Sequence, residues 1–193
     1  MPKAKLISMT SNPMDLLKKA AGMCYQKEAT DRVIQHIIKA GHLSVLEHCS
    51  ASFEVTCSIL TLLQLTRHRH LSFTCQSSRG SELQSFYKTG DEELDLYIED
   101  HFDCYRDFIE QRGFSPEMAA YLIPKGGEYK LVVSGNFRAW YEYLPKRLCK
   151  RASKEHKELA QLILKELQEA CPEVFGDLTA PCATCKESGC NFA

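Results

Sequence analysis

The sequence lacks an apolar run long enough to cross a bilayer, which argues against an integral membrane protein. Its first residues read MPKAKLISM and are too polar and too short for a secretory signal peptide. An excess of charge is also missing, since 24 Lys and Arg residues stand against 25 Asp and Glu residues in a chain of 193. A net charge of −1 disfavours a nucleic-acid-binding protein. We therefore expect neither a membrane nor a nucleic acid as partner.

Cysteine, by contrast, is abundant, with ten in the chain. Secreted disulfide frameworks usually occur in much shorter chains that carry a signal peptide. We therefore expect a cytoplasmic location, in which most of these thiols are small buried apolar groups. Cys182, Cys185 and Cys190 include a C-x-x-C pair and could join Cys171 or a histidine in a zinc site. Because no second C-x-x-C accompanies them, we expect no metal and favour a tail that is disordered or packs on a neighbouring subunit.

The spacing of apolar residues predicts a fold of mixed class. With 44% hydrophobic residues the chain can bury a core, and its length suits one domain. Helical spacing predicts helices over residues 13–24, 33–41, 59–66, 91–112 and 152–170. Alternation of apolar and polar residues predicts a strand over residues 49–57, and we expect further strands over residues 3–10 and 129–133. We expect an α+β domain over residues 1–175, with several helices on a small antiparallel or mixed sheet, followed by a cysteine-containing tail over 176–193.

Three helix starts carry a capping residue. Asn12 and Ser115 each stand directly before a proline, the arrangement typical of a cap followed by the first helical residue. Asn136 or a neighbour caps a further helix, which Pro145 is expected to interrupt because proline lacks the backbone N–H.

The densest polar segment covers residues 67–79 and reads RHRHLSFTCQSSR. An arginine fork can hold two phosphate oxygens at once, and a serine two residues before an arginine can donate to the same phosphate. A second basic cluster surrounds a predicted helix junction and comprises Arg138, Lys146, Arg147, Lys150 and Arg151. On composition alone, a solvated surface is the simpler interpretation of both clusters.

These residues nevertheless resemble the signature of the flavin-dependent thymidylate synthases, which is Arg-His-Arg, seven residues and Ser. The chain matches it from Arg67 to Ser77, and the usual Ser-x-Arg continuation ends at Arg79. The family's glutamine three residues before the signature is Gln64. Upstream, the family's Gly-His-x-Ser/Thr-x-x-Glu-His is matched over residues 41–48.

The resemblance continues towards the C-terminus. The family's Asn-x-Arg is matched by Asn136 and Arg138, and a further family arginine by Arg147. Weaker matches lie over residues 113–124 and 152–155. Collinear motifs spread over about residues 15–172 are far more specific than any one of them.

The resemblance implies a homotetramer with FAD and deoxyuridylate (dUMP) bound side by side at subunit interfaces. By carry-over, the flavin site comprises Ser44, Glu47, Arg67, His68, Arg69, Asn136 and Arg138. The substrate site comprises Gln64, Gln76, Ser77, Arg79 and Arg147, with Gln64, Ser77 and Arg79 at the phosphate. The catalytic residues are Arg147, Ser77 and His42. His42 matches a histidine near flavin and folate, or it is a capping or core residue.

The implied reaction is the reductive methylation of dUMP to dTMP, with methylenetetrahydrofolate as the carbon donor, FAD as the hydride carrier and NADPH as its reductant. Arg147 would stabilise the negative charge that develops on the uracil ring. The family is not thought to use a cysteine for this activation. Cys75 could be a nucleophile, but we favour the alternative that it is a small residue tolerated in a divergent loop.

Five positions depart from the family pattern: Cys24, Thr74, Cys75, Gly80 and Ala120. They leave open a divergent or inactive relative that acts on another pyrimidine nucleotide. A metal- or nucleic-acid-binding module is a further alternative, against which the net charge and the collinear motifs argue.

Overall fold

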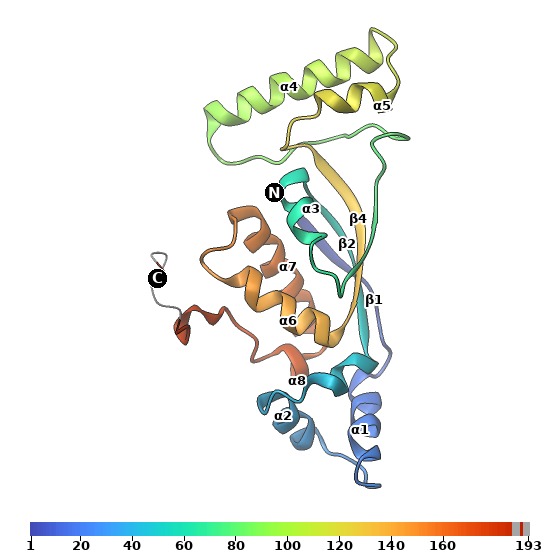
Figure 1. Ribbon diagram of the computed structural model, residues 1–193, viewed down its shortest axis with the longest axis vertical. Coiled ribbons are helices and arrows are strands. Elements are labelled where there is room, and N and C mark those ends of the chain that lie inside the picture. The colour runs from blue at the N-terminus through green and yellow to red at the C-terminus, as the bar shows by residue number, and fades with distance from the viewer. Residues whose placement is uncertain (187–189, 191–193) are drawn as a thin grey trace.

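Four antiparallel strands form a sheet in the middle of the molecule, in the order β1-β2-β4-β3 (Figure 1). The strands are β1 (Lys3–Met9), β2 (Ser50–Ser58), β3 (Ser72–Cys75) and β4 (Glu128–Asn136). This computed structural model describes residues 1–186 and 190. β2 and β4 pair along their whole length, from Ser50 opposite Asn136 to Ser58 opposite Glu128. The pairing brings the start of β2 and the end of β4 to the same place.

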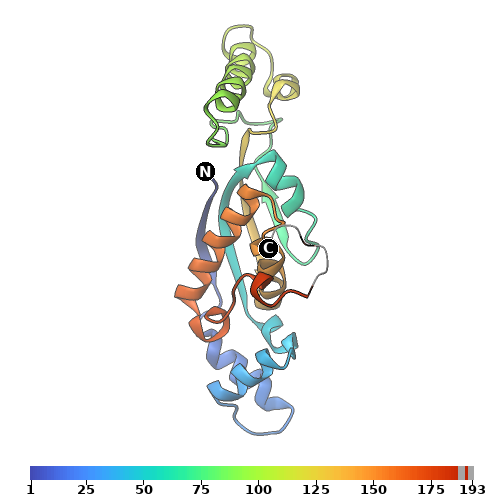
Figure 2. The same cartoon turned by 90° about the vertical axis from the view of Figure 1, so that its left-hand side faces the viewer.

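Helices cover one face of this sheet and extend the molecule at both of its ends (Figures 1 and 2). The longer helices are α1 (Pro13–Met23), α2 (Asp31–Lys39), α3 (Ile59–Leu65), α4 (Glu92–Glu110), α6 (Phe137–Leu148) and α7 (Lys154–Ala170). The short ones are η1 (Leu43–His48), α5 (Pro116–Ala119), η2 (Ala120–Leu122), α8 (Pro172–Phe175) and η3 (Pro181–Ala183). α6 and α7 lie on the sheet, α4 and α5 form one end, and α1 and α2 form the other (Figure 1).

The main core lies between the sheet and the helices α6 and α7. Alternate residues of β2, among them Phe53 and Val55, are fully buried, whereas Glu54 between them is exposed. Trp140 of α6 packs edge-on against Phe53, with ring centres 5.1 Å apart, and its Nε1–H donates to the carbonyl of Ala51 at 3.0 Å. This satisfied indole fixes α6 against the sheet, and with it the residues that α6 carries.

A smaller core lies beneath α4. Phe102 and Tyr105 are buried there, and the Tyr105 hydroxyl accepts a hydrogen bond from the backbone N–H of Leu83 at 3.1 Å. The amphipathic pattern of residues 91–112 is therefore confirmed in its second half, but Leu94 and Tyr97 remain exposed in the first half.

The predicted α+β class and the small antiparallel sheet are confirmed. Ser115 and Asn136 cap their helices as expected, since their side chains accept from the N–H groups of Met118 and Ala139. The division of the chain at residue 176 stays a prediction.

Two expectations at helix ends are wrong. Asn12 makes no side-chain cap, because its backbone is left-handed, with φ of 48°. Pro145 does not interrupt α6, which continues to Leu148. The proline stands in the last turn, where its missing N–H costs one bond to the carbonyl of Tyr141 and few residues remain to be disrupted.

The expectation that most cysteines are buried is also wrong. All ten are free thiols, but only Cys49, Cys57 and Cys171 are buried. Their location in a cytoplasm stays a prediction. Within residues 1–186 and 190, no helix is long and apolar enough to span a membrane.

Candidate functional site

The Arg67-His68-Arg69 segment connects α3 to the edge strand β3. The start of α3 is held by Ser58, whose Oγ accepts from the N–H of Thr61 at 3.3 Å. The buried carboxylate of Glu155, from α7, accepts hydrogen bonds from both the backbone N–H and the hydroxyl of Ser58. α3 is thus tied to α7 at its N-cap, Ser58, and the basic segment begins two residues after the last residue of α3.

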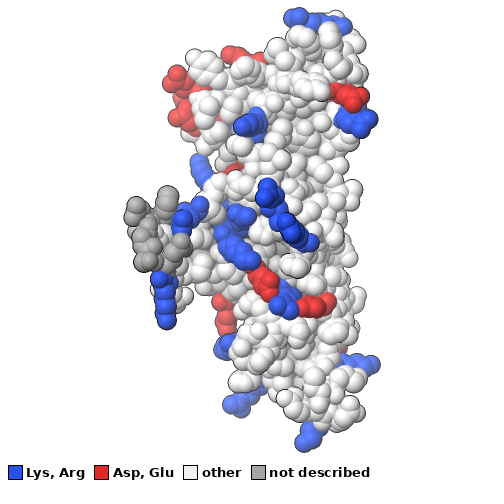
Figure 3. All heavy atoms as spheres, in the orientation of Figure 1, with Lys and Arg blue, Asp and Glu red and all other residues white. Residues whose placement is uncertain are grey.

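Two adjoining hollows lie between this segment and the first turns of α6. The first, of about 260 Å³, is lined by Arg67, His68, Arg69, His70, Leu71, Ala139, Glu142, Tyr143 and Lys146. The second, of about 280 Å³, is lined by Glu47, His70, Asn136, Arg138, Ala139 and Glu142. Together they gather six of the seven residues expected at the flavin, and Lys and Arg side chains stand across the middle of this face (Figure 3).

Arg138 connects η1 to α6 in the second hollow. Its Nη1 lies 2.6 Å from a carboxylate oxygen of Glu47, and its Nε lies 2.8 Å from one of Glu142. Asn136, which caps α6, lies at the same helix start. Glu142 was not predicted as a site residue, although its position four residues after Arg138 on a helix is a typical ion-pair spacing.

Arg147 holds His68 from the C-terminal part of α6. Its Nε and Nη2 lie 3.0 and 2.8 Å from Nε2 of His68. A guanidinium can only donate, so Nε2 accepts both bonds and the neutral ring carries its proton on Nδ1. Burial, followed by the charges of Arg147 and Lys146, lowers the pKa of His68 to about 4. The pair therefore presents one positive charge, carried by Arg147, at neutral pH.

A buried hydrogen-bonded chain lies behind this pair. The Tyr143 hydroxyl lies 2.9 Å from Nε2 of His156, and Nδ1 of His156 lies 3.4 Å from Oε1 of Gln64. His156 is fully buried, and burial followed by the nearby Arg147 lowers its pKa to about 3. Gln64 was predicted from the resemblance, whereas nothing in the sequence pointed to His156, which lies 92 residues further along the chain.

The other residues expected at the nucleotide lie on the loop after β3. The Gln76 NH₂ donates within its own loop, to Ser81 Oγ at 3.1 Å and to the Glu82 carbonyl at 3.0 Å, and the Gln76 amide oxygen accepts from the backbone N–H of Lys130 at 3.4 Å. Ser77 and Arg79 are exposed, and Arg79 Nε pairs with Glu117 at 3.1 Å. In the described part of the chain, no hydrogen bond or ion pair joins this loop to Gln64 or Arg147.

His42 and Ser44 lie exposed at the start of η1. His42 is exposed and makes no side-chain cap, so the alternative of a capping or core histidine is wrong, and its place near flavin and folate stays a prediction.

Among the positions that depart from the family pattern, Thr74 and Cys75 are exposed on the edge strand β3, and Ala120 begins η2. Partial burial still raises the pKa of the Cys75 thiol, which disfavours it as a nucleophile.

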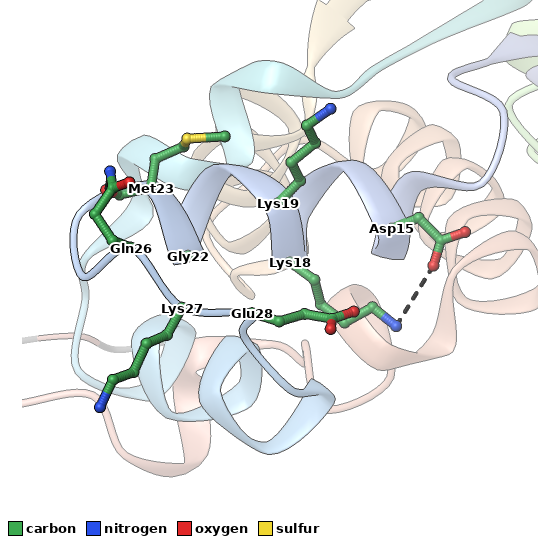
Figure 4. Close-up of a pocket in the computed structure, with 8 residues that line it drawn as sticks. All are labelled: Asp15, Lys18, Lys19, Gly22, Met23, Gln26, Lys27 and Glu28. Atoms are coloured by element: carbon green, nitrogen blue, oxygen red, sulfur yellow. Dashed lines mark hydrogen bonds and ion pairs between the residues drawn. The ribbon is translucent and has the colours of Figure 1, made fainter.

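A larger hollow, of about 490 Å³, lies at the far end of the molecule between α1 and residues 26–28 (Figure 4). Lys18 is one of its lining residues and is held by Asp15 and Asp31 at 3.4 and 3.3 Å. None of the predicted site residues lines it.

At the tail, the backbone N–H of Lys150 contacts Sγ of Cys182 at 3.2 Å. Within residues 1–186 and 190, no group of three or more His, Cys, Asp or Glu side chains is placed to hold a metal.

Comparisons with known proteins match this arrangement to one family. The family model described as thymidylate synthase complementing protein matches residues 5–173. A flavin-dependent thymidylate synthase of Mycobacterium avium is 31% identical, over 84% of this chain and 78% of the relative. One from Nitratidesulfovibrio vulgaris is 28% identical over 94% and 88%. The crystal structure of thymidylate synthase X from Helicobacter pylori with FAD and dUMP superposes with a TM-score of 0.82, at 22% identity, over 92% of this chain and 98% of that one, and it supports the fold.

Proposed function

The chain belongs to the thymidylate synthase complementing protein family, that of the flavin-dependent thymidylate synthases, and on this premise we propose that it methylates dUMP to dTMP. We propose FAD as its cofactor, with methylenetetrahydrofolate and NADPH as co-substrates. The observation that carries the proposal is the position of Arg147, which donates to His68 at the edge of the hollows beside Arg67 and Arg69.

The donor set beside the first hollow fits a cofactor that carries a pyrophosphate. Arg67 and Arg69 are exposed, and within the described residues neither makes an ion pair. Their guanidinium groups are therefore available to bind two phosphate oxygens each. Asn136 and Arg138 would hold the cofactor on the side of α6, where the carboxylates of Glu47 and Glu142 orient the Arg138 guanidinium.

In this proposal the side chains bind, orient and stabilise charge. When bound and reduced by NADPH, FAD supplies the hydride that brings the transferred carbon to the level of a methyl group. Arg147 faces the uracil ring and stabilises the negative charge that develops as C5 attacks the carbon of methylenetetrahydrofolate. The hydrogen on C5 then leaves as a proton, and tetrahydrofolate is released. His68, kept neutral, holds the Arg147 fork by accepting its two bonds.

We further propose that a second copy of the chain completes each site, within a homotetramer. Ser77 and Arg79 lie on a loop that no bond within the described residues connects to Gln64 or Arg147. Exposed apolar side chains on α4, η2 and the segment between them, among them Leu96, Tyr97 and Tyr121, are also typical of surfaces covered by another subunit.

The test begins with the visible absorbance of the purified protein after it is loaded with FAD and freed of excess. The proposal expects about one retained FAD per chain and release of tritium from C5-labelled dUMP that depends on methylenetetrahydrofolate. A protein that retains no flavin, or that retains it without turnover of dUMP, would contradict the proposal.

A second candidate is a relative with another pyrimidine nucleotide as substrate. It is favoured by Thr74, Cys75 and Ala120, which replace family residues without disturbing the core. Its signature is retained FAD together with tritium release from a nucleotide other than dUMP.

A further inference from the structure

Gln64 is oriented from inside the protein by a buried pair of side chains. The Tyr143 hydroxyl is buried, and within the described residues its hydrogen-bond partner is Nε2 of His156. Because a buried hydroxyl hydrogen needs an acceptor, Tyr143 donates and Nε2 accepts. The proton of the neutral His156 ring therefore lies on Nδ1, which donates to Oε1 of Gln64 at 3.4 Å. The Ser153 hydroxyl donates to the same oxygen at 3.5 Å.

This direction of donation fixes which end of the Gln64 amide is free. Its carbonyl oxygen is engaged on the protein side by His156 and Ser153. In the part of the chain that the structure describes, no hydrogen bond engages its NH₂ group. A half-buried amide with an engaged oxygen and a free NH₂ is a donor prepared for an oxygen of a ligand.

The same pair also lies against the other half of the site. The His68 ring packs edge-on against Tyr143, with ring centres 4.8 Å apart at 88°, and lies 6.5 Å from the ring of His156. His68 in turn accepts the two bonds from Arg147. His156 and Tyr143 thus stand between the two groups that the proposed function assigns to the nucleotide.

We propose that His156 and Tyr143 are positioning residues, which turn the NH₂ of Gln64 towards the nucleotide phosphate. An apolar residue would fill this buried position without the cost of desolvating an imidazole, so the geometry of its two bonds accounts for the histidine. The proposal rests on the proposed function, because it assigns the Gln64 amide to the nucleotide.

The experiment compares the FAD-loaded native protein with His156→Leu, using dUMP and deoxyuridine, which lacks the phosphate. We expect the KM for dUMP to rise by about tenfold, with the KM for deoxyuridine and the retained FAD unchanged. In a Gln64→Ala background the same change should add less than about twofold, since the histidine acts through the amide. His156→Gln, which keeps a donor and an acceptor, should restore part of the affinity. His101→Leu, at an exposed position of α4, is the matched control.

Tyr143→Phe keeps the ring packing and serves if His156→Leu does not fold; we expect its KM for dUMP to rise by about threefold. Equal effects on dUMP and deoxyuridine, or additive effects of His156→Leu and Gln64→Ala, would overturn the positioning role. So would a folded His156→Leu protein with native kinetics. Failure of the proposed function is distinguishable, because the native protein itself would then show no turnover of dUMP.

Discussion

Arg147 gives His68 two hydrogen bonds, from Nε and Nη2, in a fork that no other side chain provides. Lysine would keep the positive charge but offer one flexible point donor. The two hydrogen bonds of the fork therefore hold the positive charge of Arg147 at a defined position. In a reaction whose barrier depends on charge developing on a ring, the position of the cation decides its effect.

We accordingly expect Arg147→Lys to lower kcat for dUMP by about a hundredfold, with little change in the retained FAD. The measurement is steady-state tritium release from C5-labelled dUMP by the FAD-loaded protein. Arg112→Lys is the control, because the same replacement there affects an exposed pair with Asp107. A kcat for Arg147→Lys within about threefold of the native value would show that the fork is not needed.

At the scale of elements, the site depends on how α3 is anchored to α7. The buried Glu155 carboxylate accepts from the N–H and the hydroxyl of Ser58, the N-cap of α3. The basic segment that follows α3 takes its position from this anchor. Loss of the carboxylate would leave a buried N–H without a partner, which is more costly than the net value of the bond it makes.

Glu155→Ala is therefore expected to lower the free energy of unfolding by about 2–4 kcal/mol. Urea unfolding, followed by circular dichroism, measures the change. Glu169→Ala is the control on the same helix, since Glu169 is exposed and pairs with Lys165 at 3.9 Å. Its effect should stay within about 0.5 kcal/mol. Equal stabilities of the two variants would contradict the anchoring role.

His68, in the site, and His156, behind it, make the fold sensitive to acid. Burial, with the charge of Arg147 next, lowers the pKa of His156 to about 3 and of His68 to about 4. In the unfolded chain both titrate near pH 6.5. Below about pH 6.5 the unfolded chain therefore binds protons that the folded chain does not, so the free energy of unfolding falls as the pH drops towards those values.

The expected slope below about pH 6 is up to about 1.4 kcal/mol per pH unit for each histidine. Urea unfolding at about pH 7.5 and about pH 5 should show it. His156→Leu should reduce the slope by about one proton, whereas His101→Leu, at an exposed position, should leave it unchanged. An unchanged slope in His156→Leu would mean that His156 is protonated in the folded protein.

Features with local causes were predictable from the sequence. The caps at Ser115 and Asn136 depend on residues three positions away, and both predictions are confirmed. The edge strand β3 was missed because it has only four residues and its pairing partner, β4, lies more than fifty residues further along the chain. Local sequence carries no record of such a partner.

Some residues of the candidate site could likewise be predicted from the sequence, and others could not. Motif spacing pointed to His68 and Arg138, and the hollows gather them with Glu47. His156 could not be found, because its role comes from Gln64 and Tyr143, which lie on other helices. A lone histidine in a helical pattern is indistinguishable from a surface residue until the partners are in place.

At the scale of the whole molecule, the residues assigned to one nucleotide are divided between two regions. Gln64 and Arg147 lie around the buried His156, whereas Arg79 lies on an exposed loop and pairs with Glu117. We expect Arg79 to come from a neighbouring copy, because no bond within the described residues connects its loop to Gln64 or Arg147. The chains of a symmetric assembly can supply complementary parts of each site in this way.

Co-expression of Arg79→Ala and Arg147→Ala chains tests this division directly. Each variant alone is expected to be inactive, because every site lacks one of the two arginines. In a random mixture, a site is complete when its Arg147 comes from the first variant and its Arg79 from the second, so about a quarter of the native activity should return. The measurement is dUMP turnover by the purified mixed assembly, with the two variants mixed only after purification as the control. If both arginines of a site came from one chain, no mixed site would be complete, and the mixture would stay as inactive as its parts.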